Sequence, residues 1–156
     1  MAREKFDKIQ KHWKQFNISA NAIANELMRS KNIVAEMTEF YSHQYYSGEK
    51  LNVSSKGIDI ISNSKSYQVK GRKVGEKIKS TSLGIIRSWD FDFLTVLMYN
   101  NEGEIIKAIE IPSNAAKEIS KQNKHQNGWV ISTNSKLFNH VLTKDITLDL
   151  KSKLGI

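Results

Sequence analysis

Apolar residues near the N-terminus recur with the spacing of helices. Four of them fall at three- and four-residue intervals among lysines: Phe6, Ile9, Trp13 and Phe16. This spacing predicts an amphipathic helix from Ala2 to about Phe16. We expect Asn17-Ile18-Ser19 to end it and a second, short helix to follow over residues 19–28. A third helix is expected from a cap at Ser30 to about Ser47-Gly48.

The middle of the chain changes to the shorter period of strands. Two apolar runs, Gly57–Ser62 and Ser66–Gly71, flank the turn residues around Asn63 and predict a β-hairpin. The basic stretch from Lys73 to Ser88 has little pattern and is expected to be an exposed loop. Further elements are expected in this order: a buried strand over 91–99, a strand over 105–111 that Pro112 ends, a helix from a cap at Ser113 to about Asn123, a strand over 128–132 and a helix over 143–150.

This order of elements predicts an α/β (α+β) fold with a mixed central sheet flanked by helices and with extra N-terminal helices. The 156 residues suffice for one domain with a hydrophobic core.

Composition and charge exclude some kinds of site and partner and favour others. The chain has no cysteine, which excludes disulfides and thiolate metal sites and favours a cytoplasmic location. It has no apolar run of membrane-spanning length, so no membrane partner is expected. The net charge of +8 suits a polyanion such as DNA, although a solvated, lysine-rich surface explains the same number.

The hairpin carries the chemistry of greatest interest. Asp59 stands at the head of its first strand, and the second strand contains Gln68-Val69-Lys70. Residues two apart on a strand share a face, so Gln68 and Lys70 point the same way. Asp59, the side-chain oxygen of Gln68 and the backbone carbonyl of Val69 supply the oxygen ligands that Mg²⁺ prefers. Equally, Asp59 could be a turn cap and Lys70 the solvent face of an edge strand.

Gly57-Ile58-Asp59, the turn, and Tyr67-Gln68-Val69-Lys70-Gly71-Arg72 together resemble the bipartite motif of the PD-(D/E)XK nucleases, which have the restriction-endonuclease-like fold. Gln68 stands where that family usually has Asp or Glu. The resemblance implies one nuclease-like domain over 1–156, with an N-terminal extension over 1–29, a core over 30–132 and a C-terminal helix over 133–156. It also implies that Glu36, on the helix before the hairpin, is an accessory acid.

The resemblance implies a Mg²⁺-dependent endonuclease, with Mn²⁺ as an alternative ion, that hydrolyses DNA phosphodiester bonds. Asp59, Gln68, Lys70 and Glu36 would be catalytic; the metal ligands would be Asp59, Gln68, Val69 and Glu36. Lys70 would orient the attacking water. The basic residues expected to contact nucleic acid are Arg72, Lys73, Lys77, Lys79 and Arg87.

Other functions stay open. The domain could be an inactive, nuclease-like DNA-binding module or subunit, which Gln68 favours, or a protein–protein interaction domain whose charge is incidental. No phosphate-cradling loop is present, so no nucleotide cofactor is expected. One site per chain calls for a homodimer, or for two binding events, to cut both strands of a duplex. The N-terminal helices are candidates for the dimer surface.

Overall fold

The computed structural model describes residues 3–27, 32–47, 49–50, 57–75, 77–78 and 80–156. The chain divides into two compact units, Met1–Met37 and Thr38–Ile156, and each is described by itself. The boundary lies within one helix, so it does not coincide with the boundaries predicted at residues 29 and 132. Those boundaries stay predictions.

The first unit consists mainly of helix α1, Arg3–Leu27. The predicted break at Asn17-Ile18-Ser19 is wrong, because α1 continues through it. Asn and Ser each cost up to about 0.7 kcal/mol inside a helix, which is less than Gly and far less than Pro. Ser19 also accepts a hydrogen bond from Gln15, one turn earlier, at 3.4 Å.

Helix α2, Ile33–Tyr46, begins in the first unit and continues into the second. Its N-terminal cap is Asn32, whose side-chain oxygen accepts a hydrogen bond from the N–H of Ala35. Ser30, the predicted cap, lies outside the described residues. The helix ends before Ser47, which has a positive φ of 51°.

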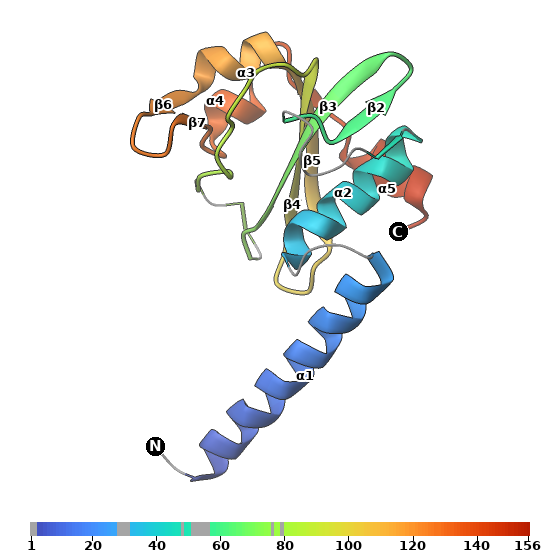
Figure 1. Cartoon of the computed structure of the whole chain (residues 1–156), viewed down its shortest axis with the longest axis vertical. Coiled ribbons are helices and arrows are strands. Elements are labelled where there is room, and N and C mark those ends of the chain that lie inside the picture. The colour runs from blue at the N-terminus through green and yellow to red at the C-terminus, as the bar shows by residue number, and fades with distance from the viewer. Residues whose placement is uncertain (1–2, 28–31, 48, 51–56, 76, 79) are drawn as a thin grey trace. The chain divides into compact units, whose positions relative to one another are not determined.

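The second unit is built on a mixed sheet, which confirms the predicted α/β (α+β) class (Figure 1). Within the described residues six strands pair in the order β1-β2-β3-β4-β5-β8. The pairing of β3 with β4 is parallel, whereas the other pairings are antiparallel. The strands are β1 Glu49–Lys50, β2 Ile60–Ser62, β3 Lys65–Lys73, β4 Phe93–Tyr99, β5 Ile105–Pro112 and β8 Lys144–Asp145.

The predicted hairpin forms from β2 and β3, and its turn explains why. Asn63 and Ser64 have φ angles of 48° and 60°, the left-handed geometry of a type I′ turn. Such turns match the twist of the two strands that they join. The first strand is shorter than predicted, because regular pairing starts at Ile60, opposite Tyr67.

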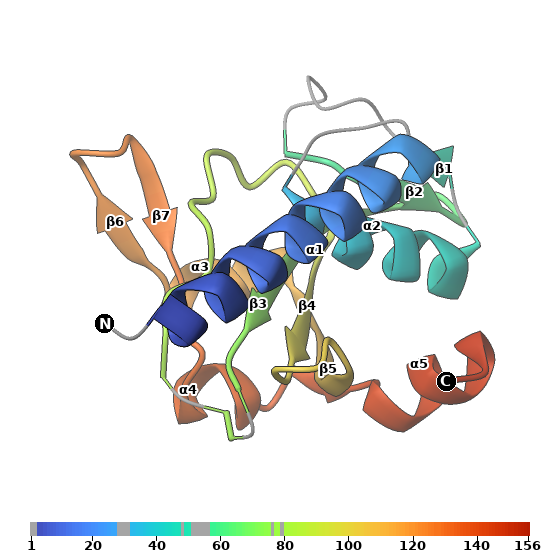
Figure 2. The ribbon, with the colours of Figure 1, turned by 90° about the horizontal axis from the view of Figure 1, so that it is seen from below.

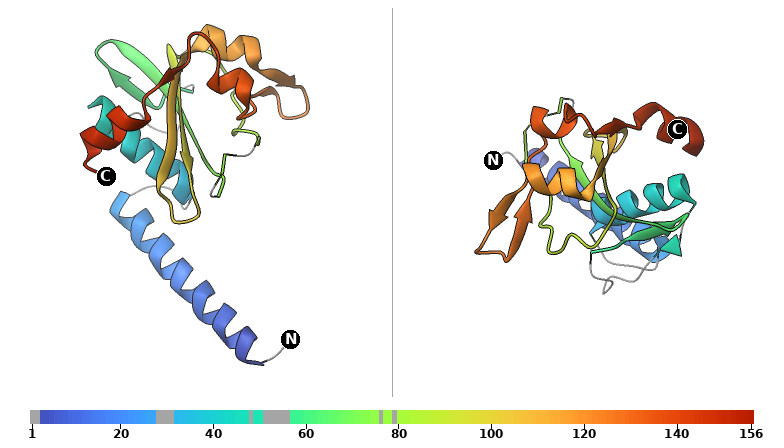
Figure 3. Two further views of the ribbon diagram at one scale, coloured as in Figure 1. Left: turned by 180° about the vertical axis from the view of Figure 1, so that it is seen from behind. Right: turned by 90° about the horizontal axis from the view of Figure 1, so that it is seen from above.

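Helices cover both faces of the sheet (Figure 3). Residues Thr38–Tyr46 of α2 and helix α5, Thr147–Leu154, lie on the face that carries Tyr67, where Tyr46 stacks on Tyr67 at 3.9 Å between ring centroids. Gly71 lies on this face, and a Cβ there would be 2.0 Å from Oγ1 of Thr38. The other face carries a second core cluster, to which β4 contributes Leu94, Val96 and Met98, α3 (Ser113–Ile119) contributes Ala115 and Ala116, and α4 (Ser135–Phe138) contributes Leu137.

The C-terminal elements differ from the prediction in three ways. Helix α3 spans only Ser113–Ile119. No side chain caps its N-terminus, so the prediction of Ser113 as its cap is wrong. Strand β6, Lys121–Asn123, replaces the end of the predicted helix and pairs with β7, Gly128–Val130, in a separate two-stranded sheet. A short helix α4, Ser135–Phe138, precedes β8 and α5, so residues 133–156 hold more than the one predicted helix.

Across the described part of the chain, we find no helix with the length and apolarity that crossing a membrane requires.

Candidate active site at the β2–β3 hairpin

Asp59 lies directly before β2 and is held by β3 at two points. Its backbone N–H donates to the carbonyl of Tyr67 at 2.8 Å. Its carboxylate Oδ2 accepts a hydrogen bond from the N–H of Val69 at 2.7 Å. The structure therefore brings Asp59 to the Gln68-Val69-Lys70 segment, as the sequence predicts.

The carboxylate of Asp59 bonds to β3 beyond the point where β2 and β3 pair with each other. Ladder pairing between the two strands ends at Ile60 and Tyr67. The N–H and C=O of one strand residue point to the same edge of the strand. Since the N–H of Val69 bonds to Asp59, the carbonyl of Val69 also points to this edge. The edge thus offers a carboxylate and a backbone carbonyl side by side.

Gln68 brings a buried acceptor to the same place. Its side chain is only 7% exposed, and among the described residues its Oε1 has no hydrogen-bond partner. A buried acceptor without a hydrogen-bond partner lowers the free energy of unfolding by about 1–3 kcal/mol. Gly57 makes room for the amide: a Cβ at Gly57 would lie 3.4 Å from Nε2 of Gln68 and 3.0 Å from Oγ of Ser88. The orphaned oxygen is the feature of this site that most suggests a ligand.

Lys70 shares the face of Gln68 and is half-buried. Its ammonium Nζ donates to the carbonyl of Ile85 at 3.0 Å, which fixes the side chain against the loop before β4. Burial lowers the pKa of Lys70, the charges of Asp59 and Glu39 raise it, and the charge of Arg87 lowers it. The net direction is downward, so Lys70 holds its proton less tightly than a lysine in water does.

The pKa of Lys70 identifies Glu39 as an acid of α2 that acts on the site. Sequence reasoning named Glu36 instead. Glu36 is 4% exposed, so it is not on a solvent-facing side of its helix. It belongs to the first unit, and its role as an accessory acid stays a prediction. Glu39 could have been found from its spacing, because residues three apart share a helix face.

The set of donor atoms suits a hard divalent cation, although the donors together carry little negative charge. Asp59, Oε1 of Gln68 and the carbonyl of Val69 are all oxygen donors, which Mg²⁺ prefers. No group of three or more His, Cys, Asp or Glu suited to a metal occurs in the part of the chain that is described. A site here would depend on neutral oxygens and bound water to complete its coordination.

The predicted nucleic-acid contacts divide into two kinds. Lys73 and Lys77 are exposed and line an open surface pocket with Gly75, Ser80, Thr81 and Asn101. The guanidinium groups each bond to a backbone carbonyl: Arg72 to Ser82, and Arg87 to Gln126 at 2.8 Å. Arg87 is exposed and retains further donors for a phosphate. Lys79 lies outside the described residues.

Trp89 has a structural role instead of a place in the site. Its ring contacts Phe91 and meets Trp129 edge-on, with ring centroids 5.7 and 5.9 Å away. It packs against the core cluster on the α3 face of the sheet. The loop from 74 to 92 is thereby anchored at the end that follows Arg87.

No family model matches this chain, and the search of curated proteins finds no match either. We therefore infer the function from the geometry of the site.

Proposed function

We propose that the protein is a Mg²⁺-dependent endonuclease that hydrolyses phosphodiester bonds of DNA. The observation that carries the proposal is the meeting of Asp59 with the Gln68-Val69-Lys70 segment. The segment supplies a carboxylate bonded to Val69, the backbone carbonyl of Val69 at the same edge, and a buried amide oxygen that has no partner among the described residues, and the charge of the carboxylate acts on the Lys70 ammonium. Metal-dependent hydrolysis of a phosphodiester uses ligands that hold the metal ion and groups that orient the attacking water, and these residues can supply both.

In this proposal Asp59, Gln68 and Val69 hold the metal through oxygen atoms. Mg²⁺, or Mn²⁺ in its place, would supply Lewis-acid stabilisation of the charge that develops on the phosphate. The carboxylate of Asp59 is oriented by the N–H of Val69. Gly57 keeps the space beside the Gln68 amide free of a side chain.

Lys70 acts on the water that attacks phosphorus. Its ammonium is fixed by the carbonyl of Ile85 and retains two other donors, which can orient the water and the phosphate oxygens. The water oxygen forms a bond to phosphorus and the water gives up one proton to the solvent. The bond from phosphorus to the leaving oxygen breaks, and the leaving oxygen takes up one proton from the solvent, so the number of protons balances. Glu39 and Asp59 balance the charge of Lys70.

DNA is the proposed partner because the exposed cationic side chains next to the site can bind the phosphates of its backbone. Lys73 follows Lys70 by three residues on β3, Lys77 follows in the loop, and Arg87 lies close enough to Lys70 to lower its pKa. The surplus of positive charge over the chain supports the same partner. A cytoplasmic location is proposed with it.

The experiment is a calorimetric titration of Mg²⁺ into the wild type and Asp59→Asn, combined with cleavage of supercoiled plasmid. The proposal requires metal binding and nicking by the wild type, and the loss of both in Asp59→Asn. The wild type should be compared with Asp145→Asn, which removes an acid on β8, away from the β2–β3 hairpin.

A second function is an inactive DNA-binding module, which the neutral Gln68 favours. It predicts DNA binding that weakens steeply with salt, without nicking in Mg²⁺ or Mn²⁺. A domain that only binds other proteins would lack the steep dependence on salt.

A further inference from the structure

The hairpin of β6 and β7 is a two-stranded ribbon separate from the central sheet. Figure 2 shows it extending outward beside α3. Six of the seven residues from Lys121 to Asn127 are amides or lysines of the kinds that contact base edges, the seventh is His125 at the tip, and all but Asn123 are exposed. No Asp or Glu occurs from Ile119 to Lys144. A groove of about 610 Å³ lies between the ribbon and Ser82-Leu83.

The base of this ribbon is attached to the segment that holds Lys70. Ile86 and Trp129 exchange backbone hydrogen bonds of 2.8 Å in each direction. A Cβ at Gly128 would be 2.6 Å from the carbonyl of Ile86, so only glycine allows this approach. The neighbouring carbonyl of Ile85 accepts the bond from Lys70. Any duplex bound at Lys70 would therefore lie close to the base of the ribbon.

We propose that the β6–β7 ribbon enters a groove of duplex DNA and selects the sequence at which the protein binds. This inference rests on the proposed function. The major groove, about 12 Å wide, admits a two-stranded ribbon, and its base edges offer acceptors to lysine and paired donor–acceptor sites to glutamine. Asn123 and Gln126 bond to each other through their side chains, which leaves Gln122, Lys124 and His125 as the reading residues.

The test compares wild type, the variant Gln122→Ala/Lys124→Ala/His125→Ala, and Lys144→Ala, which removes the same charge from β8. Each protein is used to select bound molecules from a pool of random duplexes, which are then sequenced. We expect the wild type and Lys144→Ala to enrich one base pattern. In the triple variant the enrichment of that pattern over other sequences should fall at least about tenfold, because each good base contact favours the right base by about that factor.

Enrichment of the same pattern by the triple variant would overturn the inference and leave DNA binding by the protein intact. So would a wild type that binds DNA without any base preference. A wild type that binds no DNA at all would overturn the inference together with the proposed function.

A different observation, on α1, carries a second inference that is independent of DNA. Apolar residues repeat along α1 at alternating intervals of three and four, the a and d positions of a coiled coil: Phe6, Ile9, Trp13, Phe16, Ala20, Ile23 and Leu27. Of these, Ile9 is 48% and Phe16 60% exposed. Such a narrow seam is typical of a helix that pairs with another helix.

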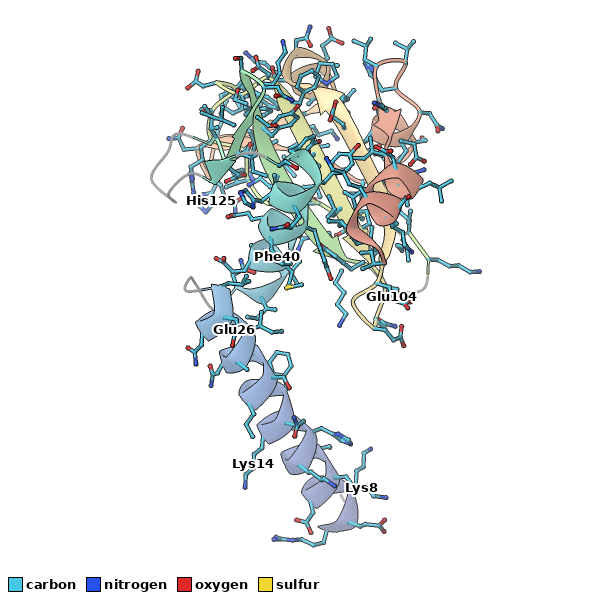
Figure 4. All side chains as sticks on the ribbon, turned by 90° about the vertical axis from the view of Figure 1, so that its right-hand side faces the viewer. Lys8, Lys14, Glu26, Phe40, Glu104 and His125 are labelled. Carbon is cyan, nitrogen blue, oxygen red and sulfur yellow. The ribbon has the colours of Figure 1, made fainter. Side chains whose placement is uncertain are left out.

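The geometry points to a second copy of this chain, with the two α1 helices antiparallel. That arrangement sets Ile9 against Ala20 of the second copy, a large residue against a small one. It also brings the exposed Lys5 near the exposed Glu26 of the second copy at both ends of the pair. In a parallel pair the two residues would lie at opposite ends. Lys8, Lys14 and Glu26 are labelled along the helix in Figure 4.

Sedimentation velocity of the full chain over a range of concentrations tests this pairing. We expect a dimer whose dissociation constant rises at least about tenfold in Ile9→Glu, because a carboxylate would be buried in the seam. The matched control is Ile18→Glu, since Ile18 is 63% exposed but lies off the seam. It should leave the dimer unchanged.

Charge exchange then tests the orientation. Lys5→Glu and Glu26→Lys should each weaken the dimer, and the double variant should restore it. A monomer at all concentrations, equal effects of Ile9→Glu and Ile18→Glu, or a double variant weaker than both singles would each overturn the antiparallel pair.

Discussion

The carboxylate of Asp59 accepts a 2.7 Å hydrogen bond from the backbone N–H of Val69. This bond joins the residue before β2 to the middle of β3, at the point where pairing between the two strands stops. It holds one acid at the backbone of Val69, where the charge of the carboxylate also raises the pKa of Lys70 against the effect of burial. The main proposal, a metal-dependent nuclease site, follows from this relationship.

Gln68→Glu should tighten Mg²⁺ binding. The change adds a negative charge a few ångströms from the proposed cation, an interaction of several kcal/mol at an effective dielectric of about 20 before desolvation is subtracted. We expect calorimetry to give an affinity at least about tenfold higher. Without metal, the buried carboxylate should lower the free energy of unfolding by about 1–3 kcal/mol.

The matched control is Gln15→Glu, which adds the same charge on the exposed surface of α1. It should leave both quantities unchanged. Equal Mg²⁺ affinities of wild type and Gln68→Glu would remove Gln68 from the ligand set.

Gly57→Ala should weaken the site as well as the fold. Gly57 has a φ of +73°, where a side chain costs about 1 kcal/mol. Its Cβ would also press on Ser88 and on the Gln68 amide. We therefore expect urea unfolding to show reduced stability and calorimetry to show weaker Mg²⁺ binding.

Gly103→Ala separates these two effects. Gly103 has a φ of +83°, and no described atom lies within 4 Å of its would-be Cβ. This variant should lose a similar stability and bind Mg²⁺ as the wild type does. If the two variants bind Mg²⁺ equally well, the space beside Gln68 has no role in the site.

Stability should fall as the pH rises above the ordinary tyrosine range. Burial raises the pKa of Tyr99 above 10.0, and its hydroxyl shares a 2.9 Å hydrogen bond with Thr38. Above that pH the unfolded chain loses the proton while the folded protein keeps it. The free energy of unfolding therefore decreases, by up to about 1.4 kcal/mol per pH unit for each such tyrosine.

Tyr99→Phe removes one of these protons and should make the decrease less steep. The measurement is urea unfolding from about pH 8 to about pH 11, on either side of the ordinary pKa. The raised pKa of Tyr46, whose hydroxyl bonds to Glu110 at 2.7 Å, predicts a residual slope in the variant. An unchanged slope in Tyr99→Phe would contradict this account.

The sequence predicted the hairpin and the two central strands because local signals agree there. Asn63 and its neighbours suit a tight turn, and β4 is an apolar run interrupted only by Thr95 and ended by the turn before Gly103. Period-two spacing also placed Gln68 and Lys70 on one face correctly. The sequence places Asp59 at the head of the hairpin's first strand, and in the structure its bond to Val69 brings it to β3.

Other features depend on tertiary contacts that no local pattern reveals. The helix over 113–119 stops early because β6 pairs with β7, which lies beyond a turn. The charge of Glu39 reaches Lys70 only in the folded unit, whereas the sequence pattern pointed to Glu36 alone. The bond from Lys70 to Ile85 joins a strand to a loop without recognisable pattern.

The most direct measurement of the central claim is the nicking of supercoiled plasmid in Mg²⁺ by wild type, Lys70→Ala and Lys144→Ala, with and without EDTA. Both variants lose one lysine, but only Lys70 lies at the proposed site. The account predicts nicking by the wild type and Lys144→Ala that EDTA abolishes. It predicts no nicking by Lys70→Ala, which should still bind DNA with nearly the wild-type affinity. Nicking by Lys70→Ala at the wild-type rate, or none by the wild type in either Mg²⁺ or Mn²⁺, would contradict it.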